Sequence, residues 1–218
     1  MNIFHRIDLR TVFSSLVAFA LLVPAAYAQE SKLLSGAELV QELKNGGYVI
    51  LIRHPDSNPT QADIDPLHLD NIKAQRQLSE KGRAQAKAMG QAFRSLSIPV
   101  GSIWTSKFQR AFEAAKLAAF APIQTSEDYT EGGLVVPPIE NQRRTAALKK
   151  ALSTVPDSGK DNIIVSHKPN ILDAVGKDVF DVSEGEAIIV KPEDGGSFRL
   201  SARVKIDAWP EMAEKFSK

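Results

Sequence analysis

The chain has 218 residues, with 27 basic and 26 acidic side chains, and it contains no cysteine. This near balance of charge argues against a nucleic-acid-binding protein, because such proteins gather a basic excess on one face. The absence of cysteine excludes disulfides, thiolate metal sites and a cysteine nucleophile. The composition therefore leaves a globular protein whose chemistry comes from other side chains.

The first 28 residues are typical of a secretory signal peptide. A short basic start over residues 1–10 precedes an uncharged apolar stretch over 11–23, and Ala26-Tyr27-Ala28 fits an A-x-A cleavage site. Cleavage would leave 190 residues with 25 basic and 25 acidic side chains. That length suits one core, so the sequence predicts a single domain over 29–218.

A retained membrane anchor is the alternative for this segment. The uncharged stretch from Thr11 to Gln29 approaches the roughly 17–25 residues that a membrane span requires. Pro24 and the small residues after it favour cleavage, after which no stable membrane span is expected. Export without cysteine indicates the bacterial periplasm.

Helical and strand patterns alternate along the remaining chain. Helices are expected at about 36–45, 80–96, 107–120, 140–152 and 169–176, strands at 48–52, 102–105 and 162–165, and a hairpin at 187–190 and 197–204. Ser35 with Glu38 forms a capping-box pattern, and Ser79 is expected to cap the second helix. The alternation predicts an α/β fold: a three-layer α/β/α sandwich, with a mostly parallel central sheet, helices on both faces and a C-terminal antiparallel hairpin.

Three expected strands end in side chains that suit an anion. Arg53-His54 follows the first strand, Lys107 and Arg110 follow the second, and His167 follows the third. Ligands of open α/β sheets collect outside the carboxyl ends of the strands. The sequence therefore predicts that these side chains meet in one phosphate site.

The residue types suggest how such a site would work. Arg53 and Arg110 can grip phosphate oxygens through their planar guanidinium groups. His54 can attack phosphorus, since a neutral imidazole is nucleophilic, and His167 can donate to the phosphoryl oxygens. The leaving group needs a proton from a carboxylic acid, for which Glu131 and Glu186 both remain candidates. No metal or other cofactor is required, and no nucleotide-binding motif is present.

Four segments, in order along the chain, resemble the motifs of the histidine phosphatase superfamily, which has the phosphoglycerate mutase-like fold. They are Arg53-His54-Pro55, the helix start Leu78–Ala86, the stretch Ile103–Ala111 and the strand Ile163–His167. The resemblance implies a metal-independent phosphomonoester hydrolase with a phosphohistidine on His54. It also suggests a small exported subgroup of that family whose substrates are poorly defined.

Further residues are expected to contact the substrate. Ser57 stands where the family often has threonine, and Ser106 belongs to the second motif. Lys107 replaces the usual Ser or Pro and would favour a more acidic substrate, while Arg76 is expected to lie over the cleft from the long polar loop 54–78. These residues, together with the stretch 121–140, would shape specificity.

Pro55 is a departure from the family motif and leaves a different function open. It replaces a glycine and removes one backbone N–H, so a phosphate-binding protein without turnover is one alternative. A metal-dependent phosphoesterase using the acidic loop 63–70 is another. A mutase and a serine hydrolase have less support. The expected partner is a small phosphorylated molecule, and the sequence gives no oligomeric state.

Overall fold

The computed structural model describes residues 32–133 and 135–217, so the predicted signal peptide lies outside the described residues. The helices are α1 (Gly36–Asn45), α2 (Glu80–Ser95), α3 (Gln109–Leu117), α4 (Pro138–Leu152), α5 (Lys168–Val175) and α6 (Ala208–Phe216). The strands are β1 (Val49–Arg53), β2 (Val100–Ser106), β3 (Ile123–Ser126), β4 (Asp161–Ser166), β5 (Ala187–Glu193) and β6 (Ser197–Val204). Short 3-10 turns cover η1 (Ile72–Ala74), η2 (Glu127–Tyr129), η3 (Lys177–Val179) and η4 (Asp194–Gly196).

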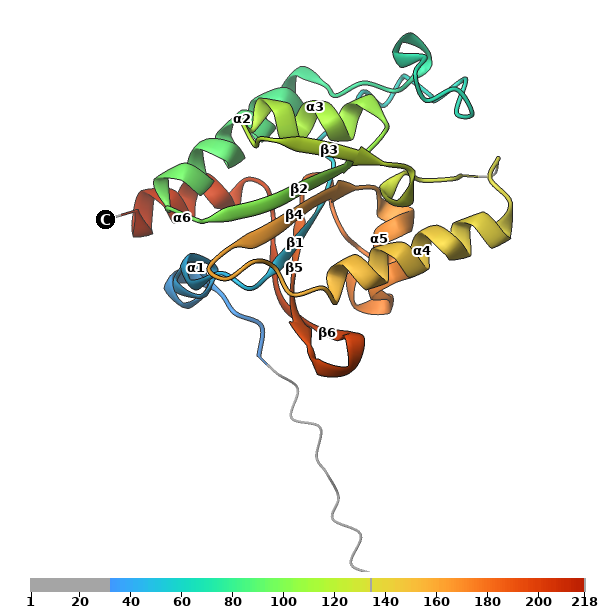
Figure 1. Cartoon of the computed structure of the whole chain (residues 1–218). Coiled ribbons are helices and arrows are strands. Elements are labelled where there is room, and N and C mark those ends of the chain that lie inside the picture. Colours follow the sequence, from blue (N-terminus) through green and yellow to red (C-terminus); the bar gives the residue numbers. More distant parts are fainter. Residues whose placement is uncertain (1–31, 134, 218) are drawn as a thin grey trace, which may run out of the picture. The chain divides into compact units, whose positions relative to one another are not determined.

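The strands form one mixed sheet in the order β3-β2-β4-β1-β5-β6 (Figure 1). β3, β2, β4 and β1 pair in parallel, whereas β5 runs antiparallel to β1 and forms a hairpin with β6. The predicted fold class is therefore confirmed, including the C-terminal antiparallel hairpin. Among the described residues, none of the helices combines the length and apolarity that a bilayer span demands.

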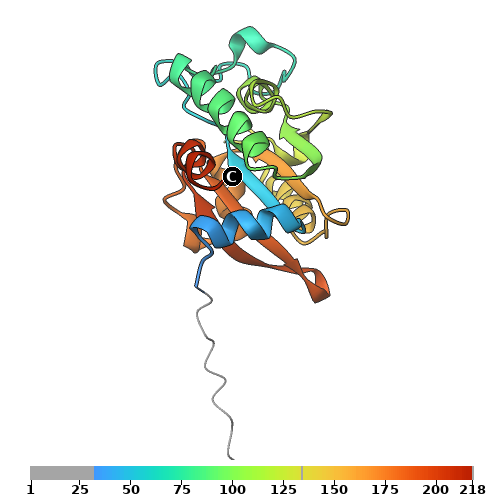
Figure 2. The same cartoon turned by 90° about the vertical axis from the view of Figure 1, so that its left-hand side faces the viewer.

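The central strand β1 is buried on both faces, and its residues alternate between two hydrophobic clusters. Ile50 and Ile52 pack with α1, α2, α3 and α6. Val49 and Leu51 pack with α4 and α5 on the opposite face. Figure 2 shows α1, α2 and α6 in front of the sheet. This double burial explains why the strand reads as an unbroken apolar run.

Of the two helix caps predicted from the sequence, one is confirmed and one is wrong. Ser79 Oγ accepts a hydrogen bond from the Gly82 N–H at 3.0 Å, so this predicted cap is confirmed. The capping box at Ser35 is wrong, because the Ser35 side chain makes no capping hydrogen bond. β3 and α6 were not predicted. β3 is a four-residue edge strand without apolar alternation, and α6 has a proline in its first turn.

Candidate active site

The ends of β1, β2 and β4 lie side by side. Arg53 pairs with Ser166 across β1 and β4, and Thr105 pairs with Val165 across β2 and β4. The residues that follow these strands are thereby brought to one edge of the sheet, on the right in Figure 1. The rings of His54 and His167 face each other with centroids 5.3 Å apart.

His54 is held as a neutral imidazole with one free ring nitrogen. Its side chain is buried, and Nδ1 lies 2.9 Å from the Pro55 carbonyl oxygen. A carbonyl only accepts, so Nδ1 carries the proton and the lone pair of the neutral ring is on Nε2. Burial, followed by the positive charge of Arg110, lowers the pKa of His54 to about 3, although the bond to Pro55 opposes this. Nε2 is therefore available as a nucleophile at neutral pH.

Arg53 is partly anchored by the 182–186 turn. Its Nη1 donates to the Val182 carbonyl at 2.8 Å, and Nη2 lies 3.6 Å from Glu184 Oε1. The Gly185 N–H donates to the carbonyls of both Arg53 and His54, which fixes the backbone where β1 ends. Arg53 Nε is buried and makes no hydrogen bond to the described part of the chain.

Arg110, in the first turn of α3, is fully buried and held by two carboxylates. Nη1 donates to Asp63 Oδ1 at 2.9 Å, and Nη2 donates to Glu131 Oε1. The guanidinium carbon lies 4.5 Å from the centre of the Phe108 ring. Within the described residues Nε of Arg110 has no partner, as is the case for Nε of Arg53.

His167 is oriented by a chain of hydroxyl groups. Its Nε2 lies 2.7 Å from Ser106 Oγ, which donates to Thr130 Oγ1, which in turn donates to the Ser126 carbonyl. Because the Ser106 proton is used toward Thr130, His167 Nε2 must be the donor to Ser106. Burial, followed by the charges of Arg110 and His54, lowers the pKa of His167 well below its usual value.

The two candidate acids have different surroundings. Glu131 Oε1 contacts Arg110 and lies 3.6 Å from Nδ1 of His167, so this carboxylate borders the histidine pair. Glu186 is buried, and its two oxygens accept from Arg203 Nε and from the Ser183 N–H, each at 2.8 Å. Glu186 thus stabilises the turn that holds Arg53, whereas Glu131 lies beside Arg110 and His167.

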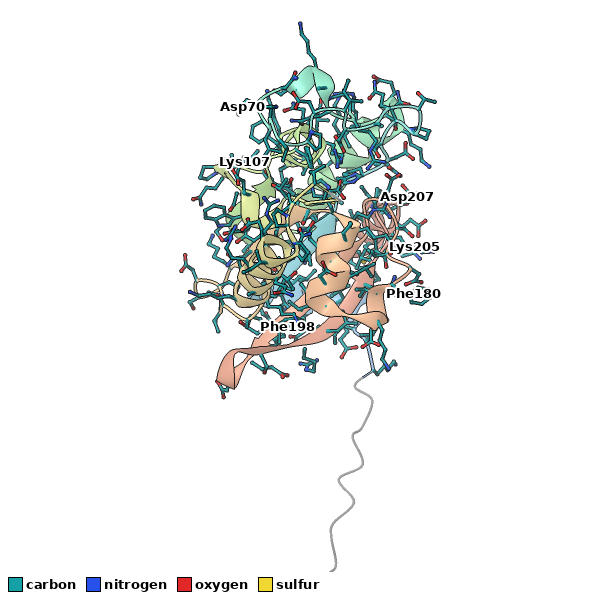
Figure 3. All side chains as sticks on the ribbon, turned by 90° about the vertical axis from the view of Figure 1, so that its right-hand side faces the viewer. Asp70, Lys107, Phe180, Phe198, Lys205 and Asp207 are labelled. Carbon is teal, nitrogen blue, oxygen red and sulfur yellow. The ribbon has the colours of Figure 1, made fainter. Side chains whose placement is uncertain are left out.

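The other residues predicted to contact the substrate, Arg76, Ser57 and Lys107, have different surroundings. Arg76 is close enough for its charge to lower the pKa of His54 and of His167, and its guanidinium makes no hydrogen bond to described residues. Ser57 Oγ donates to Glu184 at 2.8 Å, so it acts on the neighbour of Arg53. Lys107 lies at the surface (Figure 3), with its ammonium nitrogen 2.9 Å from Glu127 Oε1. It precedes α3 and faces η2, which takes its charge away from the histidines.

The carboxylates of Asp63 and Asp65 in the acidic loop 63–70 are engaged by other side chains. Asp63 is turned toward Arg110, and Asp65 accepts from His68 Nδ1 and Asn71 at 2.6 and 2.8 Å. Within residues 32–133 and 135–217, no three His, Asp or Glu side chains converge in a way that could hold a metal ion. The partnership of Asp63 with Arg110 was missed by sequence reasoning, as was the role of Thr130.

A cavity of about 440 Å³ lies away from this site. It is bounded by the sheet, η2 and α4, and its lining includes Trp104, Tyr129 and Lys150 but neither histidine. Both histidines are buried, and the 54–78 loop and the segment around Glu131 reach the neighbouring Arg110 through Asp63 and Glu131. The chemistry of the side chains, rather than the size of an opening, therefore identifies the candidate active site.

Comparison with known families agrees with this geometry. The profile of the Histidine phosphatase superfamily (branch 1) matches residues 49–136, which include Arg53, His54 and Arg110. Over these 88 of its 218 residues the chain is similar to this phosphatase superfamily. The family suggests a small phosphorylated substrate.

Solved structures show the same fold. The protein histidine phosphatase SixA, complexed with tungstate, matches with a TM-score of 0.52 at 14% identity, over 74% of this chain and 98% of that chain. YhfR from Bacillus stearothermophilus gives 0.53 at 18% identity, over 71% and 95%. A phosphoserine phosphatase from Entamoeba histolytica, in complex with 3-phosphoglyceric acid, gives 0.52 at 14% identity, over 72% and 95%. A search of curated proteins finds no significant match.

Proposed function

We propose that this protein hydrolyses phosphomonoesters, without a metal ion, through a phosphohistidine on His54. One observation carries the proposal. Three buried polar atoms of the described chain, Arg53 Nε, Arg110 Nε and His167 Nδ1, have no hydrogen-bond partner and belong to side chains grouped around His54. Buried polar groups are rarely left unpaired, and a phosphoryl group offers oxygens that would pair the two arginine N–H groups directly and His167 Nδ1 once that nitrogen is protonated.

The first chemical step forms the phosphoenzyme. The Nε2 lone pair of His54 attacks phosphorus, the bond from phosphorus to the ester oxygen breaks, and the alcohol leaves with a proton from Glu131. Arg53, Arg110 and Arg76 offset the charge on the phosphoryl oxygens during transfer. In the second step water attacks phosphorus, its proton goes to Glu131, and the phosphorus–nitrogen bond breaks to restore His54.

His167 needs a second proton to assist. In the free protein its Nε2–H is directed at Ser106, so the unpartnered Nδ1 holds a lone pair and would repel a phosphoryl oxygen. Protonation of Nδ1 would convert it to a donor, and a bound phosphate dianion favours that charge. Binding of substrate is therefore expected to take up a proton at His167.

The decisive test compares two histidines in an aryl phosphate hydrolysis assay. His54→Ala should abolish turnover, whereas His68→Ala, which changes the largely exposed histidine of the acidic loop, should retain it. EDTA should leave the wild-type rate unchanged. Loss of activity in EDTA and in His68→Ala, with His54→Ala still active, would instead establish the metal-dependent alternative. Phosphate binding without turnover of any ester would indicate a binding protein.

We also propose that the chain is exported to the bacterial periplasm. Support comes from the signal pattern of residues 1–28 and from the absence of cysteine. Cell fractionation of the full-length protein, with N-terminal sequencing of the product, tests this. A periplasmic product beginning at Gln29 is expected, and an intact N-terminus in the membrane fraction would show a retained anchor.

A further inference from the structure

Asp63 occupies a nitrogen of Arg110 that a phosphate would otherwise bind. Its Oδ1 accepts from Arg110 Nη1 and from the backbone N–H of Arg76, both at 2.9 Å. Arg110 is fully buried, while Asp63 retains 18% of its side-chain exposure. The carboxylate, partly exposed itself, therefore lies between the buried guanidinium and the solvent.

The loop that carries Asp63 is an ordered structure. Its two arms pair through Ile64 N–H to Ala74 O at 2.9 Å and Asn58 N–H to Gln77 O at 3.0 Å. Gln75 Oε1 accepts from the Gln109 N–H at 2.7 Å, which joins the loop to the start of α3. Figure 1 shows the loop extending from the end of the sheet near α3. Asp63 is thus delivered to Arg110 by a defined scaffold.

Charge makes this contact incompatible with a bound dianion. Asp63 accepts from Nη1 and Glu131 from Nη2, so two carboxylates already contact the guanidinium, and within the described residues Nε is its one nitrogen without a partner. Like charges in a buried site repel strongly, because the effective dielectric constant is low. In the proposed mechanism Glu131 is neutral when it carries the proton. Asp63 is then the carboxylate whose negative charge repels the bound phosphate.

We propose that Asp63 is an internal competitor for phosphate, which the phosphoryl group must displace from Arg110 and which returns to expel orthophosphate after hydrolysis. The inference rests on the proposed function and adds a determinant of affinity and product release. Displacement breaks two hydrogen bonds of Asp63, one to Arg110 and one to the Arg76 N–H. The contact of Asp63 with Arg110 therefore weakens phosphate binding and speeds the release of orthophosphate.

Calorimetric titration with inorganic phosphate tests the competition directly. Asp63→Asn keeps the shape and can still accept from the Arg76 N–H but loses the charge, so the Kd for phosphate should fall about tenfold or more. Asp70→Asn is the matched control: it removes a carboxylate from the same loop, at an exposed position (Figure 3) without a side-chain bond to described residues. Its Kd should match that of the wild type. An unchanged or higher Kd in Asp63→Asn overturns the proposal.

A second readout uses the wild-type protein alone. If phosphate displaces Asp63, the Arg76 N–H loses its acceptor, and its hydrogen exchange should become faster when phosphate is added. Slower or unchanged exchange, with phosphate bound, overturns the displacement. Failure of the hydrolase proposal looks different: phosphate would bind and Asp63→Asn would bind it more tightly, yet no ester would turn over. Absence of phosphate binding in all variants would overturn both proposals.

Discussion

Ser106 Oγ lies 2.7 Å from Nε2 of His167, and this contact sets the tautomer of a fully buried histidine. The direction of the bond is fixed one residue further away, at Thr130, which takes the Ser106 proton. Thr130 also accepts from the Lys107 N–H at 2.9 Å. Thr130 thereby orients the His167 ring without contacting it directly.

Thr130→Val should lower kcat with little effect on KM. Valine matches the shape of threonine but removes the acceptor of both the Ser106 hydroxyl and the Lys107 N–H, so the Ser106 side chain that orients the His167 ring loses its anchor. Misorientation of a catalytic group costs up to about 100-fold in rate. Steady-state kinetics between pH 5 and 8 measure the loss, and Thr130→Ser, which keeps the hydroxyl, should restore the rate. Equal rates and pH profiles for Val, Ser and wild type would remove Thr130 from the site.

Glu131→Gln should affect esters according to their leaving group. An alkoxide leaves poorly without a proton, whereas a nitrophenolate leaves well without one. The substitution should therefore cost about 10²–10⁴ in kcat/KM, which reports formation of the phosphoenzyme, for alkyl phosphates and much less for p-nitrophenyl phosphate.

Glu186→Gln is the matched control for this prediction. Glu186 accepts hydrogen bonds from Arg203 and from the Ser183 N–H, so the substitution should lower stability. It should reduce the rates for alkyl phosphates and for p-nitrophenyl phosphate by the same factor. If Glu186→Gln rather than Glu131→Gln shows the leaving-group dependence, the assignment of the proton donor is reversed.

Much of the candidate site was predictable because the strands that lead into it are recognisable from their sequence pattern. The apolar runs before His54 and His167 can only be central strands, and the parallel pairing then brings their ends together. The position of Arg110 was predicted in the same way, because Arg110 lies in the first turn of α3, the helix that follows β2. Each of these inferences needs only local periodicity and one general rule about where parallel strands end.

Pairings set by loops could not be predicted in this way. Asp63 lies 47 positions before Arg110, and nothing in its neighbourhood distinguishes it from Asp65 or Asp70. The same holds for Glu131 against Glu186, since both are carboxylates in loops or at strand starts. Which carboxylate meets an arginine depends on the path of the loop, and that path has no periodic signal in the sequence.

Asp161 should make stability fall as the pH rises. It is fully buried at the start of β4, with Oδ1 accepting from the Tyr48 N–H at 2.9 Å and Oδ2 buried without a partner in the described chain. Burial raises the pKa of Asp161 to about 7, against the effect of the Tyr48 bond. The folded state keeps a proton that the unfolded state releases above about pH 4, so stability is lost as the pH rises from about 4 to 7.

Urea unfolding at pH 5 and pH 8 measures this loss. Asp161→Asn cannot ionise, so the free energy of unfolding should fall less between the two pH values in the variant than in the wild type, by about 2–3 kcal/mol. Asp157→Asn changes an exposed aspartate in the preceding turn and should keep the wild-type pH dependence. An identical pH dependence for Asp161→Asn and wild type would show that Asp161 is already ionised at pH 5.

Gly82→Ala should destabilise the protein although alanine is the better helix former. A Cβ at position 82 would lie 2.0 Å from the Asp56 carbonyl oxygen, which also accepts from the Ser79 N–H at 3.1 Å. The helix propensity gain is about 1 kcal/mol, whereas forcing extra atoms into a packed contact costs about 1–3 kcal/mol, and contact with rigid backbone places this case at the upper end. Because Asp56 follows His54 by two residues, the displacement should also lower kcat.

Ala84→Gly is the control on the exposed face of the same helix, and it should cost about 1 kcal/mol without affecting the rate. A Gly82→Ala protein more stable than wild type would show that the approach of α2 to the His54 loop leaves room for a side chain.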